Sequence, residues 1–346
     1  MNPEAFVELN QVTCKTFYAN APCRRFCGFR LVGVDGSTGV LPKHKSIVEE
    51  FGITNCGPNA DSPKSMARMS LLYDVLNSTV LDAQIDKYDI SERELARRHF
   101  DVVEPGKDLL LFDRGYPSLA FMFEMQARGI DYVIRMSDNW WTEVRKMMSD
   151  GVKDKEVTFT LPEKDNKLLK KYNTTEREIK CRLVAVELEG GGTEILCTSV
   201  TNKEVLPYEC FAELYHYRWN VEEAYKLLKC RLTLEAFSGK TAIAVKQEFF
   251  AKVFTMTLTA VLAFPVDERL KAESSTRKHP HKVNRTNALA MVQEIAIPVF
   301  VHKIIRPALD AFDKILKATT ELVRTKRKFV RKKLKKKPPS INYKRL

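Results

Sequence analysis

The distribution of apolar residues predicts both strands and helices in the first 136 residues. Short apolar runs at 30–35, 68–74, 79–85, 108–113 and 132–136 predict strands. A polar stretch near 91–100 and a further stretch near 117–128 predict helices. Residues 1–29 predict a short helix followed by a loop. Because strands and helices are mixed along the chain, we expect an α/β fold with a mixed sheet flanked by helices.

Residues 137–205 have a different, β-rich composition. The segments VTFTLP, IKCRLVAVELE and TEILCTSV predict strands, and Gly190–Gly192 predicts a hairpin-like turn between the last two. We interpret this segment as an insertion that divides a core made of residues 30–136 and 206–264. The same reading leaves residues 265–322 as a helical C-terminal region and residues 323–346 as a tail.

The C-terminal region predicts helices. The most apolar run, Val253–Phe264, lies between Lys252 and Pro265 and is too short to span a membrane, so we expect a core helix. A polar loop, ESSTRKHPHKVNRT, then leads to helices near 286–297 and 300–322, which Pro298 is expected to separate. Their apolar faces can close the core or contact a second subunit, and their helical spacing favours the core.

Charge is concentrated in the tail. The chain has 57 Lys and Arg against 44 Asp and Glu, and twelve of these cations follow Leu322, which leaves about +1 for the rest. A basic tail favours binding to DNA or another polyanion, and the alternative is a solubilising extension.

The N-terminal sequence and the cysteines argue against a secreted protein and against a zinc site. The N-terminus lacks a secretory signal pattern, and the eight cysteines are scattered. Cys23 and Cys27 have no second pair that would complete a zinc site, so we expect reduced thiols in a cytoplasmic protein. His279 and His281 are expected in a loop that faces DNA or solvent.

Residues 215–229, YHYRWNVEEAYKLLK, give the most informative pattern. On one continuous helix of about four turns, Tyr215, Arg218, Glu222 and Lys229 would lie on one narrow stripe. A single carboxylate between cations and a tyrosine suits a metal ion and a phosphate bound side by side. The alternative is a set of ordinary solvated ion pairs.

Two aspartates end apolar runs. Asp35 closes RLVGVD and Asp113 closes DLLLFD, and each is followed within two residues by a glycine that permits a tight exit. A buried strand of this kind delivers its last carboxylate to the carboxyl edge of a sheet, where α/β proteins bind ligands. Either residue alone can be a turn residue. Together with Glu222, they favour a three-carboxylate site.

These motifs resemble the DDE transposases of bacterial insertion sequences, in the group with the Y-R-E-K pattern (the IS-four type). The resemblance rests on VDGSTGVLP, FDRGYPS, YHYRWNVEEAYKLLK and LEAFSGKT, and extends over residues 30–260. It implies an RNase H-like fold in which Asp35, Asp113 and Glu222 bind two Mg²⁺ or Mn²⁺ ions. It also implies that Tyr215, Arg218 and Lys229 hold DNA phosphates.

The function implied is cleavage of the element's ends and joining of their 3′-hydroxyls to target DNA, by a homodimer on paired ends near the nucleoid. The alternatives are an RNase H-like nuclease without strand transfer and a truncated, non-catalytic DNA-binding derivative. Only 34 residues precede Asp35, where family members carry a further helical domain. Trp140 and Trp141 can stack on an unpaired base or lie buried under the insertion, which is the favoured interpretation.

Overall fold

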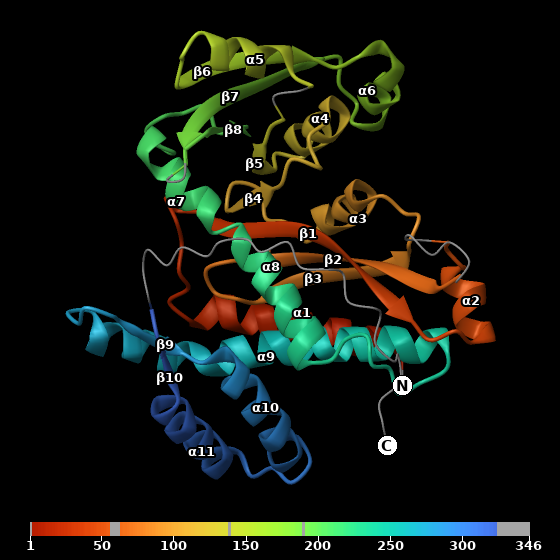
Figure 1. Cartoon of the computed structure of the whole chain (residues 1–346), viewed down its shortest axis with the longest axis vertical. Helices are drawn as coiled ribbons and strands as arrows, with labels where there is room; N and C mark the ends of the chain where they lie inside the picture. Colours follow the sequence, from red (N-terminus) through yellow and green to blue (C-terminus); the bar gives the residue numbers. More distant parts are fainter. Residues whose placement is uncertain (1, 56–62, 138–139, 189–190, 324–346) are drawn as a thin grey trace.

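A computed structural model describes residues 2–55, 63–137, 140–188 and 191–323, and its centre is an eight-stranded sheet (Figure 1). The strand order is β3-β2-β1-β4-β5-β8-β7-β6. Its strands are β1 (Arg30–Leu41), β2 (Ser65–Asp74), β3 (Val80–Lys87), β4 (Asp108–Phe112), β5 (Asp131–Arg135), β6 (Asp154–Thr160), β7 (Glu178–Glu187) and β8 (Thr193–Thr198).

The first five strands form a mixed sheet. β1 and β2 are antiparallel, as are β2 and β3, whereas β1, β4 and β5 run parallel to one another. All five residues of β4 are buried, as expected for a strand covered by helices on both faces. The predicted RNase H-like α/β sheet is therefore confirmed.

Helices cover both faces of this sheet. One face packs against α2, α7, α8 and the first half of α9, and the other against α3, α4, α5 and α6. The helices before the C-terminal region are α1 (Glu4–Asn20), α2 (Lys45–Phe51), α3 (Glu92–Arg98), α4 (Leu119–Ala127), α5 (Thr142–Ser149), α6 (Lys167–Lys171), α7 (Phe211–His216), α8 (Trp219–Lys226) and α9 (Ala242–Ser274).

β1 is longer than predicted. It passes through Asp35 and stays paired with β2 as far as Leu41, whereas its other neighbour, β4, stops at Phe112. Gly36 is therefore not a strand exit. A Cβ atom at Gly36 would lie 2.6 Å from Glu92 Cγ, so this glycine lets a side chain of α3 cross closely over the strand.

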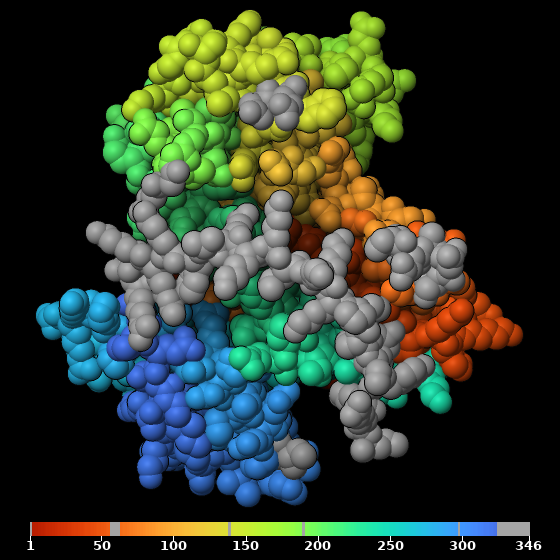
Figure 2. Space-filling view, viewed as in Figure 1, coloured from red at the N-terminus to blue at the C-terminus, as the bar shows by residue number. Residues whose placement is uncertain are grey.

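The β-rich segment 137–205 continues the same sheet. β8 pairs antiparallel with β5, and β7 and β6 follow in order. In the space-filling view this yellow-green segment lies at one end of the molecule and the blue C-terminal helices at the other (Figure 2). The parallel core strands and α8 lie between them (Figure 1).

The expected helix end at Pro265 is wrong. α9 contains Pro265 and continues to Ser274, because buried residues on both sides, such as Met256 and Val266, hold it in place. Among the described residues, α9 alone is long and apolar enough to cross a membrane by length and composition. It packs against α1, β3 and α10 (Arg285–Phe300), as a core helix does.

The C-terminal helices also differ from prediction. Pro298 lies inside α10 (Arg285–Phe300), and α11 (Ile305–Ala318) starts after a break at 301–304. The end of the predicted second helix is instead a strand, β10 (Thr320–Leu322), paired with β9 (His281–Val283). His281 therefore lies in a strand and not in the predicted loop. The basic tail beyond Val323 lies outside the described residues.

A buried ion pair joins the starts of β1 and β4. Arg30 Nε lies 2.6 Å from Asp108 Oδ1, Arg30 Nη2 lies 2.7 Å from Asp108 Oδ2, and the carboxylate is fully buried. We expect Arg30→Met to lower the free energy of unfolding by about 3–5 kcal/mol, because Asp108 loses its partner. Urea unfolding measures this loss. The exposed pair Lys153–Glu187 provides the control, since Lys153→Met should leave the free energy of unfolding nearly unchanged. Equal losses in the two variants would contradict the prediction.

Candidate active site

β1 and β4 bring the two aspartates together. The parallel register pairs Gly33 with Leu111, and two further residues along each chain lead to Asp35 and Asp113. Each carboxylate accepts a nearby backbone N–H: Gly36 N donates to Asp35 Oδ1 at 2.9 Å, and Gly115 N donates to Asp113 Oδ1 at 2.8 Å. Adjacent strand positions therefore place the carboxylates side by side where β4 ends.

The electrostatics of Asp35 show how closely the acids lie. Burial, then the negative charge of Asp113 and a smaller effect of Glu222, together raise the pKa of Asp35 to about 7. The Gly36 N–H and the Arg218 guanidinium oppose these effects. The three predicted acids thus share one electrostatic environment, in which burial and negative charge outweigh the effect of Arg218 on Asp35.

The predicted continuous helix over 215–229 is wrong. α7 ends at His216, α8 begins at Trp219, and residues Leu227–Arg231 form a π-helical turn. At the junction, Arg218 N bonds to Tyr215 O and Val221 N to Arg218 O, both at 3.2 Å, in the tighter i→i+3 pattern. A wheel of uniform pitch therefore does not describe this segment.

The four residues of the Y-R-E-K pattern nevertheless face the strands that carry the aspartates. Arg218 Nη2 donates to Glu222 Oε1 at 2.9 Å. Tyr215 is buried and its hydroxyl donates to Phe112 O at 3.2 Å. Lys229 Nζ donates to Thr38 O at 2.7 Å. Tyr215 and Lys229 thus tie the helical segment to β4 and β1, on either side of Glu222.

Several residues near the acids were missed from the sequence. Tyr225 of α8 donates from its hydroxyl to Asp35 O at 3.0 Å. Glu92 from α3 pairs with Arg68 at 2.9 Å beside Gly36. Tyr116, in the FDRGYPS motif, is buried and its hydroxyl has no hydrogen-bond partner within the described ranges. Tyr225 and Tyr116 belong to recognised motifs, but no local pattern points to Glu92.

The donor set fits hard divalent cations. In the described ranges, no three His, Cys, Asp or Glu side chains are arranged to hold a metal ion as they stand. Oxygen donors from Asp35, Asp113 and Glu222 are nevertheless the type that Mg²⁺ and Mn²⁺ prefer. Burial beside another carboxylate raises the pKa of Asp35. A bound cation would counteract this effect, because its positive charge favours the ionised carboxylates.

The tryptophans at the start of the β-rich segment differ from each other. Trp140 is 83 % exposed, so the favoured interpretation of burial is wrong for it. Trp141 packs on Phe159 with ring centroids 5.3 Å apart and is partly buried, as that interpretation predicts. Of these two tryptophans, Trp140 is the one whose ring is exposed enough to stack on a flat ligand.

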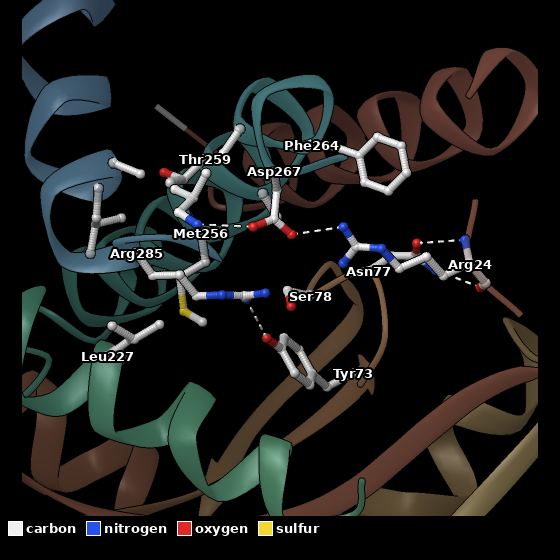
Figure 3. A pocket seen from close by; sticks show the side chains of 15 residues that line it. Arg24, Tyr73, Asn77, Ser78, Leu227, Met256, Thr259, Phe264, Asp267 and Arg285 are labelled. Atoms are coloured by element: carbon white, nitrogen blue, oxygen red, sulfur yellow. Dashed lines mark hydrogen bonds and ion pairs between the residues drawn. The ribbon is translucent and has the colours of Figure 1, made fainter. Parts of the chain in front are cut away.

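A cavity among the described residues lies away from the acids (Figure 3). It encloses about 50 Å³ between the end of β2, α9 and α10, and Arg24 and Asp267 pair at 2.7 Å along its wall. None of the three acids lines it. We assign it to the packing of the C-terminal helices on the core.

Comparison with known families identifies the family of this chain. The model of the transposase DDE domain family matches residues 29–258, a range that contains all three acids. The chain belongs to the DDE transposase family. This DDE transposase is related to the transposases of IS4-type insertion elements, which confirms the resemblance found in its motifs.

Individual relatives agree with the family. The DDE transposase is 25 % identical to the transposase InsG for insertion sequence element IS4 of Escherichia coli, over 78 % of this chain and 60 % of InsG. It is 25 % identical to the putative transposase y4zB of Sinorhizobium fredii, over 60 % and 51 % of the two chains. It therefore spans about half to three-fifths of the length of these relatives. A solved piggyBac transposase synaptic complex with hairpin DNA aligns with a TM-score of 0.45 and 9 % identity, over 83 % of this chain and 57 % of that chain.

The raised pKa of Asp35 predicts a pH dependence of stability. Without metal, the folded state keeps the Asp35 proton up to about pH 7, whereas the unfolded state loses it near 3.8. The stability contributed by this proton is complete below about pH 4 and is lost as the pH rises to about 7. Asp35→Asn should remove this loss. As the pH rises from 4 to 8, the free energy of unfolding of the metal-free variant should therefore increase by roughly 2–4 kcal/mol relative to that of wild type. Urea unfolding measures this change. A constant difference between the two proteins would contradict this.

Proposed function

We propose that this DDE transposase cuts DNA at the ends of an insertion sequence and joins the freed 3′-hydroxyls to target DNA. Asp35, Asp113 and Glu222 would hold two Mg²⁺ or Mn²⁺ ions. The observation that carries the proposal is the convergence of these acids from β1, β4 and α8 in a segment that matches the family. Bound at this site, the ions would activate the attacking oxygen and stabilise the leaving one.

The residues around the acids have chemistry suited to a phosphodiester. Arg218 Nε is buried and has no hydrogen-bond partner in the part of the chain that the structure describes, while Nη2 already holds Glu222. A phosphate oxygen beside Glu222 would satisfy this donor with a charge-assisted bond. Arg218 would thereby position both the acid and the DNA.

Tyr215 and Lys229 would face DNA phosphates on either side of Glu222. Lys229 uses one ammonium proton on Thr38 O and is only partly buried, so two protons remain for a DNA oxygen. Tyr215 is more enclosed, and its contact with Phe112 O favours a role in holding α7 against β4. We therefore assign direct phosphate binding to Arg218 and Lys229, and a weaker contribution to Tyr215.

The partners proposed are the element's terminal inverted repeats, target DNA and a second copy of the chain on the paired end. The formal charge of +13 and the names of the relatives support DNA as the ligand. A bacterial enzyme of this kind would act on the nucleoid in the cytoplasm.

Two alternatives share parts of this evidence. A nuclease without strand transfer would use the same three acids, so only the reaction products separate it from a transposase. A non-catalytic DNA-binding derivative would bind DNA but would cut none. Both alternatives are outcomes of one experiment.

The test is incubation of the protein with a supercoiled plasmid and with labelled element ends, with Mg²⁺, with Mn²⁺ and with chelator. We expect metal-dependent nicking together with products in which an end is joined to the plasmid. Nicking without joined products would support the nuclease. DNA binding without nicking in any metal would overturn the catalytic proposal.

A further inference from the structure

A fully buried arginine links the β-rich segment to the start of the helical segment that carries Glu222. Arg182 on β7 is 0 % exposed. It donates two hydrogen bonds to Asp154 of β6, from Nε to Oδ1 at 2.8 Å and from Nη2 to Oδ2 at 2.7 Å. Its third nitrogen, Nη1, donates to Leu206 O at 2.6 Å. Every guanidinium nitrogen is therefore satisfied, as burial of this charge requires.

The contacts of Arg182 fall where the chain enters α7. Leu206 lies just before that helix, and Phe211, its first residue, places its ring 5.2 Å from the guanidinium carbon. Tyr208, between them, donates from its hydroxyl to Ala185 O at 2.9 Å. β7 thus fixes the entry to α7 at three points.

Glu222 follows eleven residues after Phe211 on the helical segment formed by α7, the tight junction and α8. The position of its carboxylate therefore depends on how the start of α7 is held. The tie from Tyr215 to Phe112 O supports the middle of this path, but the described residues that support its beginning belong to β7.

We propose that Arg182, held by Asp154, is a positioning residue that sets α7 on β7 so that Glu222 reaches Asp35 and Asp113. This inference rests on the proposed role of Glu222 as a metal ligand. It gives the β-rich segment a defined task, since that segment supplies both members of the ion pair. Outer-shell residues that orient a metal ligand typically change metal affinity or activity by 10–100-fold when they are removed.

The molecule contains a matched control. Arg30 and Asp108 form a second two-bond pair in the same sheet, at the starts of β1 and β4. Arg30→Met leaves the buried Asp108 without its partner, whereas Asp154 is partly exposed and keeps Lys203 at 3.4 Å when Arg182 is replaced. Arg30→Met should therefore destabilise the fold at least as much as Arg182→Met, but only Arg182→Met should affect the active site.

The experiment compares wild type, Arg30→Met, Arg182→Met and Arg182→Lys at a temperature where circular dichroism shows each protein folded. Calorimetry gives the Mn²⁺ affinity, and plasmid nicking at saturating Mn²⁺ gives kcat. We expect Arg182→Met to weaken Mn²⁺ affinity about tenfold and to lower kcat by 10–100-fold. Arg182→Lys, which keeps the charge without the fork, should lie between. Arg30→Met should match wild type in both.

Wild-type Mn²⁺ affinity and kcat in Arg182→Met would overturn the inference and leave the proposed function standing. So would equal losses in Arg30→Met, because they would indicate a general effect of instability. If Arg182→Met does not fold, Arg182→Lys and Phe211→Leu decide by the same two measurements. A wild-type protein that neither binds Mn²⁺ nor nicks DNA would overturn the proposed function as well.

Discussion

Asp113→Ala and Glu222→Gln are each expected to lower metal-dependent nicking by about 10³-fold or more without unfolding the protein. Each substitution removes an oxygen ligand, and with it charge stabilisation at the reacting phosphate. Neither side chain holds the fold: among the described residues, Asp113 accepts a hydrogen bond from the nearby Gly115 N, and Glu222 accepts one from Arg218 one turn away. For Asp113→Ala, removal of a negative charge beside Asp35 should even favour the metal-free folded state at neutral pH.

Nicking rates at saturating Mg²⁺ and thermal unfolding without metal measure the two effects. Glu223→Gln is the matched control, because Glu223 is the next residue of α8, is exposed and pairs only with Lys226. It should keep wild-type nicking. Full nicking by either Asp113→Ala or Glu222→Gln would remove that residue from the proposed centre.

Gly33→Ala is expected to cause the second large loss of activity, by about 10²-fold, through a shift of α8. A Cβ atom at Gly33 would lie 3.0 Å from Val75 Cγ1 and 3.3 Å from Val221 Cβ. Val221 Cβ is fixed to the helix backbone, so the helix must yield by a few tenths of an ångström, and it carries the adjacent Glu222 with it. Small displacements of a catalytic group can cost this much, whereas the stability loss should be only about 1–3 kcal/mol.

Gly39→Ala tests whether that loss reflects the position of α8. Gly39 lies on the same strand, but its new Cβ would crowd the flexible end of Met69, at 2.7 Å from Cε, and would make an ordinary contact with Glu235 Oε1 at 3.7 Å. This variant should nick within about threefold of wild type, since the side chain can move aside. The comparison requires kcat at saturating metal together with urea unfolding of both variants. Similar kcat values for the two alanine variants would show that contact between β1 and α8 does not set the position of Glu222.

Strands with one clear signal were predictable. β4 and β5 are continuous apolar runs with turn residues nearby, and their buried positions match that reading. The strand predicted at 30–35 is shorter than β1 because Gly36 resembles a turn residue. Its second half exists because β2 offers a partner as far as Leu41, and such long-range pairing leaves no local mark. α9 passes Pro265 for a related reason, since tertiary packing on both sides compensates for one missing hydrogen bond.

The candidate site shows the same division. Asp35, Asp113 and Glu222 could be named because each lies in a local motif, and the structure brings them into one environment. The tight turn at Arg218 and the π-helical turn at Lys229 could not be foreseen, because a helical wheel assumes a uniform pitch. Glu92 and Arg182 reach their places through strands and helices distant in sequence, so only the folded chain shows their contacts.

The shared sheet limits how this protein can be recombined with its relatives. Because β8 hydrogen-bonds directly to β5, the β-rich segment cannot be exchanged as a detachable module. A chimera with junctions near 137 and 205 would replace β8, which hydrogen-bonds to β5. It would also replace β7, which holds the entry to α7. New material is accommodated more easily beyond β6, the outer strand of the described sheet. Variation in length among related enzymes should therefore accumulate beside β6, while the seam between β5 and β8 stays constant.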